Sequence, residues 1–357
     1  MGSPPPAPPP DARALRARLV PWYRAARRDL PWRDTRDAYR VWISEAMLQQ
    51  TRVETAVDYW RRFVARFPTM ADLAAAGEDE VLALWSGLGY YDRARKLRAA
   101  ARAIVERHGG RFPAERAAAL ELPGVGPYTA GAVLSIAHDL SEALVDGNVA
   151  RVLCRLFGIE GDPARAPAKG RLWELARALV PREGGAGEWN QALMELGALV
   201  CTPRAPHCAD CPLARDCVAL RDGLVDELPR ARGPRAPIAV ELTVLLARRD
   251  GRWLLERRPA GGRMAGLLQF PTCELSRSAG APGELFPRAC HGLVRGRELG
   301  RISHAITHHR IRARVFAARA RSGAARDGRT WRRRSELSAL GLTGMARKIL
   351  RAGLLER

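Results

Sequence analysis

The sequence predicts a multi-domain protein in which an all-α domain is followed by an α+β domain. Apolar residues recur at helical spacing over most of residues 11–200, and no segment there has a clear strand pattern. A loop with four cysteines follows at residues 201–217. Beyond residue 238, short apolar runs and alternating apolar and charged residues replace the helical spacing, as in half-buried strands.

The helical domain is expected to contain about ten helices. Asp11 is placed to cap the first, in which Leu15, Leu19 and Trp22 recur at helical spacing. A longer periodic segment, residues 41–67, is expected to form the next. The remaining clear helical segments are residues 79–85, 93–108, 129–138, 149–157, 172–180 and 189–200.

A linker is expected over residues 218–237, because the proline- and glycine-rich run at 228–237 breaks every periodicity. The second domain then covers residues 238–357. Its apolar runs at 240–246 and 253–255 flank Asp250-Gly251, which is typical of a hairpin turn. Residues 310–318 alternate apolar side chains with arginine, as a strand would, and a last helix is expected near 344–352.

Composition excludes several classes of protein. The chain has 357 residues, of which 47% are hydrophobic and 27% charged, which is ordinary for a soluble globular protein and not for a disordered or collagen-like one. No run approaches the ~20 apolar residues of a membrane-spanning helix. Residues 1–10 are proline-rich and lack the pattern of a secretory signal, so a flexible tail and a cytoplasmic protein are expected.

The formal net charge of +21 favours a polyanionic partner, with nucleic acid as the first candidate. The basic residues are almost all arginine; the only lysines are Lys96, Lys169 and Lys348. Residues 238–357 hold 25 basic against 9 acidic residues, a net charge of +16, and the rest of the chain has +5. Contact with a polyanion is therefore expected mostly through the last third of the chain.

Four cysteines form the strongest single signal. Cys201, Cys208, Cys211 and Cys217 follow a C-x6-C-x2-C-x5-C spacing, so their thiolates can converge on one metal centre. Zinc also accepts four cysteines, typically as two separate C-x2-C pairs. The single C-x2-C and the uneven outer spacings favour a 4Fe–4S cluster. Cys154, Cys273 and Cys290 lie apart and are expected to be packed as small hydrophobic residues.

A second signal is the run Leu122-Pro-Gly-Val-Gly-Pro-Tyr-Thr-Ala130. A turn at Gly124, Val125 and Gly126 lies between two helical segments and opens the second at its N-terminus. Backbone N–H groups and the helix dipole there suit a DNA phosphate. The run therefore predicts a helix–hairpin–helix motif at residues 122–130.

The helix–hairpin–helix, the Asp146 that follows it and the cysteine loop together resemble the endonuclease III superfamily of DNA glycosylases. Within it, the segments 31–33, 41–51, 87–91, 145–149 and 190–194 are similar to those of MutY-type adenine glycosylases. The resemblance is dense over residues 20–220 and looser beyond. It implies an iron–sulfur glycosylase domain followed by a Nudix-like (MutT-like) domain.

Removal of adenine requires a proton for the leaving base and negative charge opposite the developing sugar cation. Glu45 is flanked by Ile43 and Met47, and burial among such neighbours raises a carboxyl pKa. The resemblance assigns to Glu45 the protonation of adenine and the activation of water. It assigns to Asp146 the stabilisation of the cation, supported by Asn148 and Tyr128. Lyase-active relatives carry a lysine at the position of Tyr128, so a monofunctional enzyme is expected.

Other roles also come from the resemblance. Gln49, Gln50 and Tyr90 are expected to wedge into the duplex while the target base is flipped out. Arg28, Arg33 and Gln191 are expected to line the adenine pocket. Thr307 and His308 match the lesion-reading loop of the family, although Ile306 replaces its aromatic residue. A catalytic Nudix domain needs clustered glutamates to hold Mg²⁺, and none is found here.

The expected function is hydrolytic removal of adenine mispaired with 8-oxoguanine or guanine in double-stranded DNA. The expected protein is a monomer, bound to DNA in the nucleoid and not to membranes. The main alternative is a bifunctional glycosylase and lyase acting on oxidised pyrimidines, which Tyr128 and the second domain disfavour. A non-catalytic iron–sulfur DNA-binding module is disfavoured by the pair Glu45 and Asp146. The missing glutamates disfavour a Mg²⁺-dependent nucleotide hydrolase.

Overall fold

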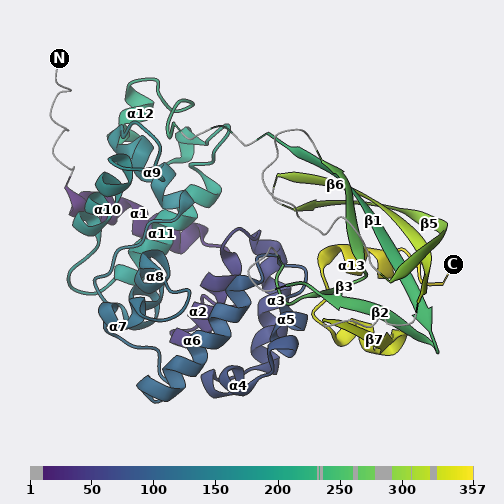
Figure 1. Cartoon of the computed structure of the whole chain (residues 1–357). Helices are drawn as coiled ribbons and strands as arrows, with labels where there is room; N and C mark the ends of the chain where they lie inside the picture. Colours follow the sequence, from purple (N-terminus) through teal and green to yellow (C-terminus); the bar gives the residue numbers. More distant parts are fainter. Residues whose placement is uncertain are drawn as a thin grey trace. The chain divides into compact units, whose positions relative to one another are not determined.

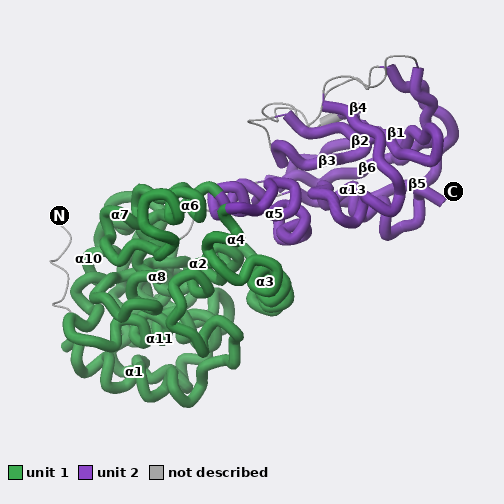
Figure 2. The backbone as a smooth tube through the Cα atoms, turned by 90° about the horizontal axis from the view of Figure 1, so that it is seen from below, with its two compact units in different colours: residues 1–74, 99–233 green, residues 75–98, 234–357 purple. Residues whose placement is uncertain are grey.

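The computed structural model describes residues 11–230, 233, 236–259, 264–277, 292–306, 308–321 and 328–356. The chain forms two compact units, coloured separately in Figure 2. Residues 1–74 and 99–233 form the N-terminal unit, and residues 75–98 and 234–357 form the C-terminal unit. The predicted tail at 1–10, Cys290 and Thr307 lie outside the described residues. No described helix is long and apolar enough to cross a membrane.

The N-terminal unit is helical, and residues 11–230 contain no strand, which confirms the all-α prediction. Asp11 caps the first helix as expected, since its side chain accepts a hydrogen bond of 2.9 Å from the backbone N–H of Arg13. The helices, labelled in Figure 1, are α1 (Ala12–Ala26), α2 (Ala38–Leu48), α3 (Val53–Arg66), α4 (Met70–Ala75), α6 (Asp92–His108), α7 (Arg116–Leu120), α8 (Pro127–His138), α9 (Gly147–Phe157), α10 (Ala168–Leu179), α11 (Ala186–Leu199) and α12 (Val218–Arg221). Helix α6 crosses from one unit to the other.

The long helix expected over residues 41–67 is wrong in one respect, because two helices, α2 and α3, occupy this segment. The helix breaks at Gln50, whose φ of 60° is left-handed. The backbone N–H of Thr51 then bonds to the carbonyl of Leu48 in a tighter turn. Sequence periodicity missed the break because glutamines are good helix formers and no glycine or proline marks it.

The core of the N-terminal unit lies where α1, α8, α9, α10 and α11 meet. Leu15 and Leu19 of α1 pack with Leu153 of α9 and with Trp189 and Leu193 of α11, all at most 1% exposed. Helices α8, α9 and α11 carry Tyr128, Asn148 and Gln191 of the candidate site, so the core sets the relative positions of these three side chains.

The C-terminal unit is built on a mixed sheet, which confirms the α+β prediction. Its strands are β1 (Ile238–Arg249), β2 (Arg252–Arg257), β3 (Leu268–Gln269), β4 (Thr272–Arg277), β5 (Leu293–Ile306), β6 (His309–Ala320) and β7 (Arg329–Arg333). The main path has the order β3-β2-β1-β6-β5, with β1 parallel to β6 and β5 antiparallel to β6. The final helix, α13 (Gly344–Arg351), packs Met345, Ala346 and Ile349 against the sheet's apolar face.

Helix α5 (Glu78–Trp85) also belongs to the C-terminal unit. The hydroxyl of Ser86 donates a hydrogen bond of 3.0 Å to the carbonyl of Leu342, and Arg257 forms an ion pair with Asp79 at 3.0 Å. A Cβ at Gly341 would lie 3.1 Å from the Cβ of Leu82, so the backbone there approaches α5 closely. The C-terminal unit is therefore made of two separate segments, and no single boundary in the sequence divides the chain into its two units.

Candidate active site

A cavity of about 430 Å³ lies within the N-terminal unit. Such a volume falls in the range of small-molecule sites. The residues around it come from α2, α8, α9, α11 and the segment after α1; those predicted from the sequence are Arg28, Arg33, Glu45, Gln49, Gln50, Tyr128, Asp146, Asn148 and Gln191. The structure therefore gathers residues that are up to 163 positions apart in the sequence.

Glu45 is held inside the cavity wall by α2. Asp37 caps this helix, accepting a 2.9 Å hydrogen bond from the backbone N–H of Tyr39. Most of α2 is buried, and Glu45 itself is only 4% exposed. The pKa of Glu45 is raised to about 7, chiefly by burial and also by the nearby Asp146, against the lowering effects of a hydrogen bond from Tyr128 and of the Arg33 charge. The carboxyl can therefore carry a proton near neutral pH.

Tyr128 lies on α8 directly beside Glu45. Its hydroxyl bonds to the Glu45 carboxyl and approaches the sulfur of Met194 at 3.8 Å. Burial, together with the two neighbouring carboxyls, raises the pKa of this phenol well above its ordinary value. The hydroxyl therefore stays protonated, and it supplies a hydrogen bond and no amine.

Asp146 occupies the N-cap of α9, as its Asp-Gly-Asn sequence suggests. One carboxyl oxygen accepts a 2.7 Å hydrogen bond from the backbone N–H of Val149, and the other accepts one of 3.1 Å from the Asn148 amide. Burial raises the pKa of Asp146, and these hydrogen bonds oppose the rise. The cap thus fixes the carboxyl in place and favours its charged form.

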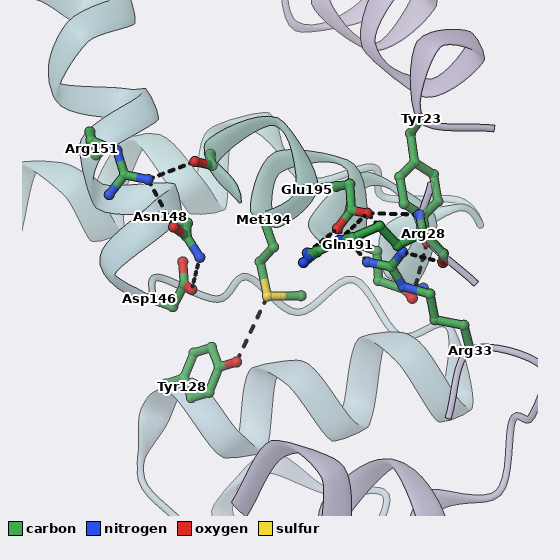
Figure 3. A network of polar contacts seen from close by, with 11 residues as sticks. Tyr23, Arg28, Arg33, Tyr128, Asp146, Asn148, Arg151, Gln191, Met194 and Glu195 are labelled. Atoms are coloured by element: carbon green, nitrogen blue, oxygen red, sulfur yellow. Dashed lines mark hydrogen bonds and ion pairs between the residues drawn. The ribbon is translucent and has the colours of Figure 1, made fainter. Parts of the chain in front are cut away.

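A polar chain continues from Asp146 away from the cavity, as Figure 3 shows. Asn148 accepts a 2.8 Å hydrogen bond from Arg151, which also donates to the carbonyls of Gly197 and Cys201 at 2.7 Å each. Sequence reasoning missed Arg151. The i,i+3 spacing from Asn148 on one helix was the available signal.

Gly197 lets α11 approach the start of α9. A Cβ at this position would lie 2.6 Å from the Cβ and 3.0 Å from the Cα of Asn148. Any larger residue would have to push the Asp-Gly-Asn turn away. The absence of a side chain at Gly197 therefore positions the Asp146 carboxyl.

The other side of the cavity holds a carboxylate that the sequence analysis did not identify, Glu195 of α11, which is 1% exposed. Arg28 donates to it through Nε at 3.0 Å and Nη2 at 2.8 Å, and Arg33 donates at 3.0 and 2.6 Å. Burial pushes the pKa of Glu195 up, but the hydrogen bonds from both arginines outweigh it and hold the pKa at about 2. Glu195 is therefore ionised and fixes both guanidinium groups.

Gln191 lies one turn before Glu195 on the same helix. It accepts a 3.2 Å hydrogen bond from the hydroxyl of Tyr23 and donates one of 3.2 Å to the carbonyl of Gly187. Figure 3 places Met194 between this group and the Asp146 group. The cavity thus has an acidic side, an arginine side and an apolar divider.

The predicted DNA-contacting residues of this unit lie at two places. Gln49 and Gln50 line the cavity after α2, and the Gln49 amide donates to the Thr129 hydroxyl at 3.3 Å. Gly124 has a left-handed φ of 78°, and Gly126 caps α8 with nothing within 4 Å of its Cβ position. The turn through Val125 therefore leaves an open helix N-terminus, as an anion site requires.

Tyr90 and His308 belong to the C-terminal unit. Tyr90 is 47% exposed with a left-handed φ of 48°, and the guanidinium of Arg93 lies 5.5 Å from its ring centre. The rings of His308 and His309 are 4.3 Å apart. Thr307, the other predicted lesion-reading residue, lies outside the described residues.

The four cysteines of residues 201–217 lie on the loop after α11. Cys201, Cys211 and Cys217 pack against the core of the N-terminal unit, and all four influence one another electrostatically. Backbone N–H groups of residues 213, 219 and 220 bond to the sulfurs of Cys211 and Cys217. Among the described residues no group of three His, Cys, Asp or Glu side chains is close enough to hold one metal ion. A cubane has a different requirement, because each of its four cysteines binds a different iron atom.

Arg155 anchors this loop and was also missed by the sequence analysis. It is only 3% exposed. Its guanidinium lies 3.4 Å from the sulfur of Cys201 and donates to the carbonyls of Thr202 at 2.7 Å and Leu228 at 2.9 Å. The buried positive charge is therefore met by the sulfur of Cys201 and by two backbone carbonyl groups.

Comparison with known proteins agrees with this arrangement. Residues 43–178 match the family described as HhH-GPD superfamily base excision DNA repair protein, and residues 243–352 match the NUDIX domain. The thermostable thymine-DNA glycosylase of known structure is similar, with a TM-score of 0.54 and 33% identity; the match covers 59% of this chain and 97% of that one.

Sequence relatives are more specific. The adenine DNA glycosylase of Mus musculus is 36% identical, and the alignment covers 96% of this chain and 78% of the relative. That of Homo sapiens is 49% identical over 58% of this chain and 39% of the relative. The chain belongs to the adenine DNA glycosylase family of base excision repair enzymes, which hydrolyse the N-glycosidic bond of a base in DNA.

Proposed function

We propose that this glycosylase removes adenine paired with 8-oxoguanine or guanine and leaves an abasic site. The observation that carries the proposal is the buried pair in one cavity: Glu45, with a pKa of about 7, and Asp146, held by a helix cap. Glu45 can give a proton, and the hydrogen bonds to Asp146 favour the charged form of that carboxyl, as glycosidic bond hydrolysis requires.

In the proposed mechanism, adenine leaves the base stack and enters the cavity between the acidic and arginine sides. Glu45 protonates the base, and Tyr128 orients the Glu45 carboxyl. The Asp146 carboxylate stabilises positive charge on the sugar. Arg28 and Arg33, fixed by Glu195, and the Gln191 amide bind the edges of the base.

The reaction is proposed to stop at the abasic site, because the described residues that line the cavity offer no amine to attack the sugar. A lyase needs a lysine or similar amine to form a Schiff base. Tyr128 occupies the corresponding position, and no residue lining the cavity is a lysine. These facts support a monofunctional enzyme over the bifunctional alternative.

The chemistry of the donor set fits a 4Fe–4S cluster held by Cys201, Cys208, Cys211 and Cys217. Backbone N–H groups at two sulfurs and Arg155 at a third would stabilise thiolate ligands. When bound, the cluster would hold the two ends of the loop together, from Cys201 after α11 to Cys217 before α12. We also propose the domain boundaries expected from the sequence. These are a helical domain at 11–200, the cluster loop at 201–217, a linker at 218–237 and a Nudix-like domain at 238–357.

The C-terminal unit is proposed to recognise 8-oxoguanine opposite the adenine through Thr307 and His308. Tyr90, Gln49 and Gln50 are proposed to hold the duplex open, and the turn at Gly124, Val125 and Gly126 to bind a phosphate. We further propose a monomer acting on cellular DNA in the cytoplasm.

The test is incubation with duplexes that contain one A:8-oxoguanine pair, one A:G pair or one A:T pair. Strand lengths after alkali report base loss, and strand lengths without alkali report lyase activity. We expect alkali-dependent cleavage at the adenine of the first two duplexes only. Cleavage without alkali, or equal cleavage of all three, would contradict the proposal.

A further inference from the structure

The outward face of the β5–β6 hairpin carries a row of arginines. On β6, Arg310, Arg312 and Arg314 are exposed and alternate with the buried residues Ile311 and Ala313. Residues two apart on a strand lie on the same face at a spacing of about 7 Å. Three guanidinium groups therefore line one side of this strand over about 14 Å.

Neighbouring strands add one arginine and two glutamates to this face. Arg301 on β5 is directly opposite Arg314 on β6, and like charges in that position are destabilising. Glu298 forms ion pairs with both, at 3.0 Å to Arg301 and 2.5 Å to Arg314. Glu241 on β1 is opposite Arg312. On the described strands this face thus presents four arginines and two glutamates.

Packing of the inner face of these strands does not explain why the outer face carries arginine. Ile311, Ala313 and Val315 point into the core of the unit, against Val240 and Leu242. The outward positions need only be polar, and a surface that merely stays soluble mixes both signs of charge. This face also mixes both signs, but its four arginines outnumber its two glutamates, and this excess indicates an anionic partner.

We propose that this arginine face (Arg301, Arg310, Arg312 and Arg314) binds the phosphate backbone of duplex DNA beside the lesion. The inference rests on the proposed function, in which the β5–β6 turn reads the base opposite adenine. Arg310 lies next to His309, the first residue of β6 after that turn. The row therefore begins next to the proposed lesion-reading turn.

The phosphates of a DNA duplex are spaced closely enough to contact every arginine of the row. A duplex carries one negative charge per roughly 1.7 Å of its axis, so about eight phosphates lie within the 14 Å that the arginines span. Arginine binds phosphate through two parallel hydrogen bonds, which adds geometry to the attraction. An acidic peptide would need carboxylates at matching alternate positions.

The test is binding of the full-length protein to a duplex with an A:8-oxoguanine pair over a series of salt concentrations. The variant is Arg310→Gln with Arg312→Gln. Loss of two phosphate contacts should make the slope of log K against log salt shallower by about 2. Affinity at low salt should fall several-fold. Arg310→Lys with Arg312→Lys should retain most of the slope, because charge and not residue identity sets it.

A matched control removes the same charge elsewhere in the unit. Arg249 and Arg252 are also exposed, lie on neighbouring strands and are directly opposite each other. Arg249→Gln with Arg252→Gln should leave the slope unchanged. Equal loss in both double variants would indicate general attraction by net charge and would overturn the proposal.

Excision in the same samples separates this proposal from the proposed function. The Arg310/Arg312 variant should excise adenine at the wild-type rate at saturating protein concentration and keep its preference for 8-oxoguanine. Failure of the unmodified protein to release adenine would contradict the proposed function. Normal release with an unchanged salt slope in the variant would overturn only the arginine face as a DNA site, and would leave an acidic protein as its occupant.

Discussion

Glu45 shows how a side chain acquires its chemistry from its neighbours. Sequence alone places it between apolar residues of a helix, and that setting predicts a raised pKa. The structure confirms the direction: burial raises the pKa to about 7, with Tyr128 and Asp146 as the polar groups nearby. The proposed acid is thus protonated at the pH at which it would work.

The first prediction is that Glu45→Gln retains duplex binding and loses adenine excision by at least ~100-fold, since an amide has no acidic proton to give. Single-turnover excision and a binding titration on the same duplex measure the two effects separately. Excision within a few-fold of wild type would remove Glu45 from the role of acid.

Glu45 should also make stability depend on pH. Its folded pKa of about 7 lies above the ordinary 4.5, so the folded state binds more protons between these values. Protonation of Glu45 in the folded state contributes about 3 kcal/mol to the free energy of unfolding. This contribution is fully present below pH 4.5 and is lost as pH rises through 7. Glu45→Gln should therefore be more stable than wild type at pH 8 and nearly equal at pH 5. Denaturant unfolding at both values checks this, and a difference that does not change with pH would refute it.

Glu195 should matter far more than a surface partner of the same kind. Glu195→Ala leaves Arg28 and Arg33 without their shared carboxylate in a buried site, and breaking such a group costs about 3–5 kcal/mol. Glu188 lies on the same helix as Glu195 and forms an exposed ion pair with Arg24 of α1, so Glu188→Ala should cost far less. Urea unfolding of both variants gives the comparison, and equal losses would contradict it.

Glu195 also shows where prediction from the sequence ends. The resemblance placed Arg28 and Arg33 at the adenine pocket, but Glu195 is 162 positions beyond Arg33 and no motif links them. Two arginines in one buried pocket require a carboxylate, and that charge argument was the only signal available. Which of the 38 acidic residues fills the role is decided by how α11 packs beside the segment after α1.

Helices and strands were predicted well where one period continues and poorly where it changes. Helix α8 and strand β6 keep their periods, and the structure confirms both. Strand β5 was not predicted, because its register shifts at two irregularities between Arg295 and Gly300. A bulge interrupts the alternation that identifies a strand. The break between α2 and α3 likewise depends on one left-handed residue.

The contact between α9 and α11 gives a prediction about catalysis from packing. Gly197→Ala should displace the turn at Asn148 and so misplace the Asp146 carboxyl, which lowers the single-turnover rate at least tenfold while DNA binding persists. Gly170→Ala on α10 is the control, since no atom lies within 4 Å of its Cβ position. It should leave the rate unchanged and stabilise the helix by up to about 1 kcal/mol. A normal rate for Gly197→Ala would show that the turn tolerates the methyl group.

The two units also divide the chain's charge, and this suggests how the whole molecule reads DNA. The last 120 residues carry +16, whereas the cavity with the proposed chemistry lies in the other unit. Truncation after residue 233 should leave slow adenine excision with little preference for 8-oxoguanine over guanine. Rates on both mispairs measure this. Full discrimination by the shortened protein would place lesion reading in the helical unit.

Helix α5 adds a second consequence for that truncated protein. Leu82, 1% exposed in the whole chain, packs where Gly341 approaches, and so would be uncovered. The shortened protein should therefore aggregate more readily than the intact one when both are heated. Light scattering during a thermal ramp measures this, and equal aggregation would contradict it.

Residues 75–98 belong to the C-terminal unit, whereas the residues before and after them belong to the N-terminal unit. The C-terminal unit therefore cannot be exchanged as one continuous segment. A chimaera that exchanges only the residues after 234 between two glycosylases would pack α5 of one protein against the Gly341 segment of the other. A working exchange must also carry the 75–98 segment. A substitution in α5 where it faces Gly341 would therefore have to be matched by changes in the distant domain and not in the helices beside it in the sequence.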